Sequence, residues 1–132
     1  MRHALFATFL AFLLAASPSF AAGGPPYPVG LKQIEFTEGD RDIALAMFYP
    51  ATLSDKSTEP TGLPFFTNLH LYRDAELAEG RYPLVMLSHG RGSNPLQYAW
   101  FAETLAAHGY IVAGLYHYRA NTYDQTIAYL SN

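Results

Sequence analysis

The sequence predicts an α/β fold in a chain of 132 residues. Residues 84–115 have the pattern of a strand, a glycine-containing turn, a helix and a second strand, which indicates a parallel crossover unit. Two apolar segments, 34–36 and 43–49, precede this unit and predict an antiparallel strand pair. Half of the residues are hydrophobic and 14% are charged, a composition that fits one folded domain and excludes a disordered chain.

The first 21 residues predict a secretory signal peptide. A short positive start precedes the run 4–16, which is apolar except at Thr8, and Ser19 and Ala21 supply small residues for cleavage after Ala21. An uncleaved membrane anchor is the alternative, but 13 residues reach only about 20 Å into a roughly 30 Å hydrocarbon core. We therefore expect a periplasmic or secreted domain over 22–132, with no stable membrane span after cleavage.

The next segments predict a linker followed by a hairpin. Residues 23–28 are all glycine or proline except Tyr27, which favours an irregular linker. Residues 38–41 have the composition of a turn between the two antiparallel strands, and Pro50 is expected to close the second strand.

A polar, turn-rich excursion is predicted over 51–80. Thirty residues is long for a loop in a compact domain, so we expect a short helix around 74–79. Phe65 and Phe66 are expected to hold the excursion against the body of the domain.

The crossover unit carries the clearest local signals. Residues 84–87 form an apolar run without alternation, which is typical of a strand covered on both faces. After the turn 88–93, Asn94 can cap a helix whose first position suits Pro95. Gly109 is expected to end this helix, because glycine readily adopts the left-handed conformation found at helix C-termini.

Two elements follow this helix. Residues 110–115 predict a second buried strand, and 124–130 could begin another helix. No later strand follows in this sequence, so we expect 110–115 to be an unpaired apolar edge of a parallel sheet.

The glycine-containing turn has three chemical interpretations. A dinucleotide-binding fingerprint needs a third glycine where Pro95 stands, and a phosphate-binding loop needs a Gly-Lys-Ser/Thr ending that is absent. The third interpretation is an oxyanion hole, in which the backbone N–H after His89-Gly90 faces a developing carbonyl oxyanion. That N–H belongs to Arg91.

At this point the sequence resembles a known family. The motifs at 83–94, 105–113, 116–118 and 121–124 are similar to α/β-hydrolases, above all to exported bacterial dienelactone-hydrolase-like proteins related to platelet-activating-factor acetylhydrolase. The resemblance implies a mostly parallel sheet flanked by helices, hydrolysis of a small-molecule ester by a serine nucleophile, and no cofactor. It also implies that the amide of Arg91 contributes to the oxyanion hole.

The sequence departs from the family at the nucleophile. The family's serine lies in Gly-x-Ser-x-Gly on a strand-to-helix turn, and neither Ser88 nor Ser93 has those glycines. We therefore expect the N-terminal part of a hydrolase, inactive alone, with the triad beyond residue 132 and a C-terminal complementing chain as a candidate partner. The alternative is an exported non-catalytic interaction or binding module that retains half of the fold.

Other candidate site residues have weaker signals. His89 and Gly90 could shape the turn and contact substrate, although a buried histidine bonded to backbone is the simpler interpretation of His89. His117 follows a strand end, where it could line the cleft or be an ordinary loop residue. With His108, these histidines lack metal-ligand spacing, and a net charge of −3 offers no basic surface for nucleic acid.

Overall fold

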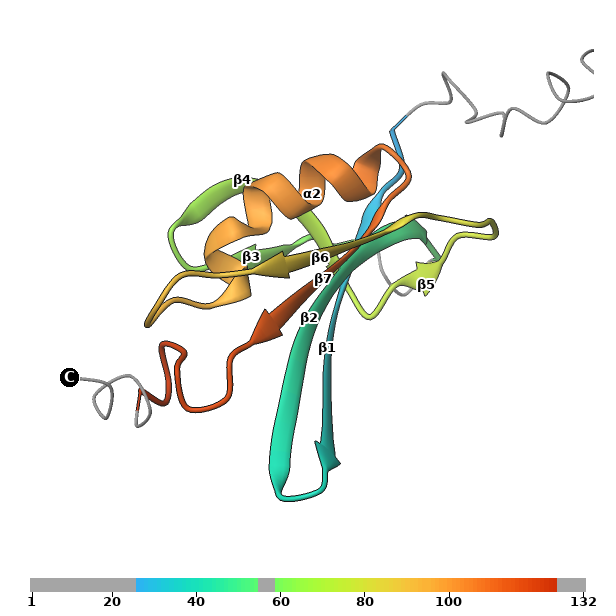
Figure 1. Cartoon of the computed structure of the whole chain (residues 1–132). Coiled ribbons are helices and arrows are strands. Elements are labelled where there is room, and N and C mark those ends of the chain that lie inside the picture. Colours follow the sequence, from blue (N-terminus) through green and yellow to red (C-terminus); the bar gives the residue numbers. More distant parts are fainter. Residues whose placement is uncertain (1–25, 55–58, 126–132) are drawn as a thin grey trace, which may run out of the picture.

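The computed structural model describes residues 26–54 and 59–125 and contains one curled sheet covered on one face by a helix (Figure 1). The sheet order is β3-β4-β1-β2-β7-β6, and β5 pairs with the end of β2. The elements are β1 (Val29–Glu38), β2 (Arg41–Thr52), β3 (Thr61–Leu63), β4 (Phe66–Arg73), β5 (Glu76–Leu77), β6 (Leu84–Ser88), the 3₁₀ helix η1 (Pro95–Tyr98), α2 (Ala99–Ala107) and β7 (Ile111–Tyr116).

The sheet is mixed, so the expectation of a mostly parallel sheet is wrong. Strands β6 and β7 are parallel, as are β1 and β4. The β1–β2, β2–β7 and β3–β4 pairs are antiparallel. The reason is that only β6 and β7 are joined by a helical crossover, whereas the short turn between β1 and β2 reverses the chain. The fold class is α/β with a strongly antiparallel N-terminal half.

The predicted strand pair is confirmed and is longer than expected. It runs from the pair Val29–Pro50 to the pair Glu38–Arg41. Gly39 has a φ of 64°, which suits the two-residue turn at its tip. The tip projects beyond the other strands (Figure 1). Pro50 does not end β2, because Ala51 continues the strand and donates its N–H to the carbonyl of Pro28.

The excursion after β2 is mostly strand, and the helix expected around 74–79 is absent. Strands β3 and β4 form a hairpin, and β5 pairs with Ala51 and Thr52 of β2. The N–H of Ala78 donates to the carbonyl of Pro50, so the backbone there bonds across the sheet instead of within a helix. Phe66 packs against the core, but Phe65 is fully exposed, so it does not hold the excursion in place.

The helix start and stop follow the predicted signals. The side chain of Asn94 accepts a hydrogen bond from the N–H of Leu96 at 3.0 Å, which caps the first turn. That turn is 3₁₀ and continues directly into α2. Gly109 follows with a φ of 87°, which ends the helix before β7.

Among the described residues, β6 and not β7 is an edge strand of the sheet. Strand β7 lies between β2 and β6, so the expectation of an unpaired edge at 110–115 is wrong. On β6, Leu84 is 60% exposed and Met86 is 63% exposed, so the expected burial on both faces is also wrong. The helix expected over 124–130 lies mostly outside the described residues.

The core lies between α2 and one face of the sheet. Ala99, Ala102 and Ala106 are fully buried and pack with Phe48 of β2 and Val112 of β7. Alanine at these positions lets the helix backbone approach the strands closely. The positions that alternate with Phe48 and Val112 point to the other face, where Met86 is exposed.

Gly114 permits the close approach of η1 to β7. A Cβ at Gly114 would lie 2.4 Å from the Cβ of Pro95, so we expect Gly114→Ala to lower the free energy of unfolding by about 3 kcal/mol. Gly62→Ala is the matched control, because a Cβ there meets nothing within 4 Å. Chemical denaturation measures both changes, and equal destabilisation of the two variants would contradict the packing described here.

Candidate functional site

Two segments meet at the carboxyl ends of the parallel strands β6 and β7. We call residues 89–94, which follow β6, the His-Gly turn, and residues 117–124, which follow β7, the β7 loop. Open α/β sheets bind ligands at this edge. The structure therefore brings the predicted residues His89, Gly90 and Arg91 to one segment and His117 to its neighbour.

His89 is buried at the base of the turn. The residue is 5% exposed. Its Nδ1 lies 2.8 Å from the carbonyl oxygen of Gly90, and its Nε2 accepts a hydrogen bond from the backbone N–H of His117 at 3.3 Å. A ring bonded to backbone on both sides holds the two segments together. These contacts agree with the structural interpretation of His89 and supply none to a substrate.

His117 contacts Ser88, which the sequence analysis did not assign to the site. The Oγ of Ser88 lies 3.0 Å from Nε2 of His117, and the His89 and His117 rings contact edge to face at 4.4 Å between centroids. Ser88 is paired with Leu115 in the sheet, so His117 lies just two residues beyond the position opposite Ser88. Aligning the two strand ends in parallel register could have predicted this pair.

The β7 loop bonds along the length of the His-Gly turn. The hydroxyl of Thr122 donates to the carbonyl of Gly92 at 3.1 Å and accepts from Nδ2 of Asn94 at 3.0 Å. The N–H of Thr122 donates to the carbonyl of Ser93 at 2.8 Å. Asn94 therefore caps η1 and also ties the turn to the loop, so the position of the turn depends on both elements.

Gly90 and Arg91 lie where the turn leaves the sheet. The carbonyl oxygen of Gly90 accepts the N–H of Ser93 at 3.1 Å as well as the bond to His89. A Cβ at Gly90 would meet nothing within 4 Å, so there is open space beside the peptide that joins Gly90 to Arg91. A carbonyl oxygen of a substrate could approach the turn from that side.

A small apolar cavity adjoins the turn. Its volume is about 210 Å³, and its lining comes from the β3–β4 hairpin, the start of η1 and the β7 loop. Phe65 at the hairpin tip has a φ of 72°, and such left-handed backbone in a bulky residue is strained. The lining residues are Leu63, Pro64, Phe65, Phe66, Asn94, Leu96, Gln97, Thr122 and Tyr123.

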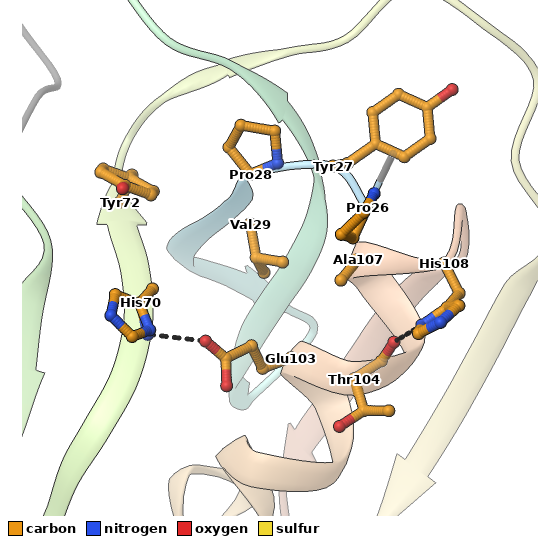
Figure 2. A pocket seen from close by; sticks show the side chains of 10 residues that line it. All are labelled: Pro26, Tyr27, Pro28, Val29, His70, Tyr72, Glu103, Thr104, Ala107 and His108. Carbon is orange, nitrogen blue, oxygen red and sulfur yellow. Dashed lines mark hydrogen bonds between the residues drawn. The ribbon is translucent and has the colours of Figure 1, made fainter. Parts of the chain in front are cut away.

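A larger cavity of about 460 Å³ lies at the other end of α2 (Figure 2). Figure 2 shows His70 of β4 facing Glu103 of α2, whose Oε1 accepts the backbone N–H of His70 at 2.6 Å. His108 contacts the carbonyl of Thr104 through Nδ1 at 2.7 Å. These polar groups form hydrogen bonds within the protein. The cavity is also remote from the His-Gly turn.

The electrostatics of the site are mild. Burial raises the pKa of Tyr116 at the end of β7, and the hydrogen bond from Gln33 partly offsets this shift. Among residues 26–54 and 59–125, no group of three histidine, aspartate or glutamate side chains is placed to hold a metal ion. None of the helices described is long and apolar enough to cross a membrane.

Comparison with known proteins assigns this architecture to a class. The structure matches a ferulic acid esterase from Streptomyces cinnamoneus with a TM-score of 0.62 and 23% sequence identity, over 77% of this chain and 37% of the esterase. The chain thus spans little more than a third of the esterase's length. The fold is that of an α/β-hydrolase.

The sequence comparison shows a resemblance to one family. The family model of platelet-activating factor acetylhydrolase, isoform II, matches residues 66–128, which include the His-Gly turn and the β7 loop. This segment, slightly less than half of the chain, is thus similar to the acetylhydrolase family, as the motifs predict. A search of curated proteins found no significant match.

Proposed function

We propose that this chain is the N-terminal part of an exported serine esterase, in which the amide of Arg91 stabilises the oxyanion. The observation that carries this proposal is the His-Gly turn, held at the carboxyl ends of β6 and β7 within the segment that matches the acetylhydrolase family. Serine attack on an ester carbonyl places negative charge on its oxygen, and one well-placed N–H stabilises that charge by about 3 kcal/mol.

The proposal places the serine nucleophile outside residues 1–132. The sequence contains no Gly-x-Ser-x-Gly. Within residues 26–54 and 59–125, β6 is an edge strand, and its Leu84 and Met86 are exposed. A parallel strand added to this edge would end beside the His-Gly turn, where a nucleophile could reach a carbonyl bound to the Arg91 amide. That strand belongs either to the same polypeptide or to a complementing second chain.

The Ser88–His117 pair is a possible competitor for the role of nucleophile and base. Its 3.0 Å separation is within the reach expected of such a pair. However, Ser88 lies within β6 and not on a strand-to-helix turn, and an activated serine of this family occupies that turn. We therefore assign the pair to holding the two strand ends together.

Ester turnover tests the proposal. The mature protein expressed from its complete gene is expected to hydrolyse a short-chain nitrophenyl ester and to lose this activity when treated with a serine-reactive phosphonate. The 132-residue chain alone is expected to show no turnover above the buffer rate. Phosphonate-sensitive turnover by the isolated chain would contradict the proposal, as would turnover by the complete protein that the phosphonate leaves intact.

A further inference from the structure

We propose that His89 is a positioning residue that aims the Arg91 amide at the substrate, an inference that rests on the proposed role of that amide. The ring of His89 is buried and bonded at both nitrogens, to the carbonyl oxygen of Gly90 and to the N–H of His117. It thereby connects the His-Gly turn to the β7 loop.

The two bonds of His89 require one particular form of its ring. A carbonyl oxygen can only accept a hydrogen bond, so Nδ1 must carry a proton to donate to Gly90. A backbone N–H can only donate, so Nε2 must be unprotonated to accept from His117. Only the neutral ring with its proton on Nδ1 satisfies both partners, and the backbone on either side therefore selects the tautomer.

The orientation of the Gly90–Arg91 peptide follows from the bond at Nδ1. The carbonyl oxygen and the N–H of a trans peptide point in opposite directions, and no cis peptide occurs among the described residues. The carbonyl oxygen of Gly90 accepts hydrogen bonds from Nδ1 of His89 at 2.8 Å and from the N–H of Ser93 at 3.1 Å. Fixing that carbonyl toward His89 directs the N–H of Arg91 away from the buried ring.

Neighbouring bonds make the anchor of His89 rigid. The carbonyl of His117 accepts Nδ2 of Asn121 at 2.8 Å, and the ring of His117 contacts the hydroxyl of Ser88. The backbone N–H that holds Nε2 of His89 is therefore fixed by both the β7 loop and β6. Glycine at position 90 places no side chain against the peptide, so the bond to His89 is a principal restraint on the peptide plane.

Nitrogen NMR of the imidazole rings tests the tautomer directly. In the complete gene product labelled with ¹⁵N, at neutral pH, His89 is expected to show a protonated Nδ1 and an unprotonated Nε2. His117 and His108 serve as internal references in the same spectrum. A ring protonated at Nε2 alone, or at both nitrogens, would overturn the proposal.

Two isosteric substitutions test the positioning role. The side-chain amide of His89→Gln can replace Nε2 but not Nδ1, so the bond to Gly90 is lost, and we expect kcat to fall about 10- to 100-fold with KM nearly unchanged. The amide of His89→Asn can replace Nδ1, so this variant is expected to recover most of the lost kcat. Thermal unfolding of both variants separates catalysis from stability.

The outcomes distinguish the positioning role from the proposed function. Equal kcat losses in the two variants would overturn the role of His89, even if phosphonate-sensitive turnover shows that the esterase assignment holds. Absence of any such turnover would refute the proposed function, and the NMR tautomer would then still decide whether His89 orients the peptide.

Discussion

Replacing Arg91 with proline is expected to lower the kcat of the proposed esterase by about 100- to 1,000-fold, because proline removes the N–H to which we assign stabilisation of the oxyanion. KM should change little, since the oxyanion forms only after the substrate has bound. Arg91 is not among the residues with positive φ, so its backbone does not exclude proline on that ground. Steady-state kinetics with an activated ester measures the effect.

The matched control is Arg91→Ala, which retains the N–H and removes the side chain. The side chain of Arg91 has no role in the proposed chemistry, so this variant should lose less than about fivefold in kcat. Circular dichroism and thermal unfolding of both variants check that the turn is still folded. Equal losses in the two variants would assign the effect to the arginine side chain and would contradict the oxyanion role of the amide.

Placing a charge on the open edge of the sheet is expected to have opposite consequences in two forms of the protein. In the 132-residue chain, Met86 is 63% exposed, so Met86→Lys should change the free energy of unfolding by less than about 0.5 kcal/mol. It should also reduce self-association, because a lysine on an edge strand opposes pairing with another chain. In the complete protein, a segment packed on the face of the sheet that carries Met86 would bury this lysine at a cost of about 3 kcal/mol or more.

Phe36→Lys is the control for that comparison. Phe36 is also partly exposed, but it lies on the projecting end of the β1–β2 hairpin, away from β6. We expect it to have a small and similar effect in both forms. Denaturation and light scattering of the four proteins give the result, and a Met86→Lys variant that is equally stable in both forms would show that nothing covers this face of β6.

The crossover unit could be predicted from sequence because its signals are local. Asn94, Pro95 and Gly109 each act on the backbone within a few residues, and all three perform the expected role at the ends of the helix. The antiparallel pair before it was also predictable, since a short turn joins its strands. The predicted residues His89, Gly90 and Arg91 lie together because they are consecutive in one turn.

The sheet order and the contacts of the site could not be predicted from local sequence signals. Strand β2 pairs with β7 across more than sixty residues, and no local pattern specifies such a pairing, so the open edge was assigned to β7 instead of β6. Strands β3 to β5 could not be predicted, because turn-forming residues interrupt this part of the sequence. The Ser88–His117 contact depends on the register of two strands and becomes visible only when they are aligned side by side.

In the proposed esterase, β6 is completed by a segment that carries the serine nucleophile to the His-Gly turn. Labelling the complete gene product with a fluorophosphonate probe, followed by peptide mass spectrometry, tests this claim most directly. We expect one labelled serine, in a Gly-x-Ser-x-Gly sequence outside residues 1–132. Label on Ser88 or Ser93, or no label on a protein that hydrolyses esters, would contradict it.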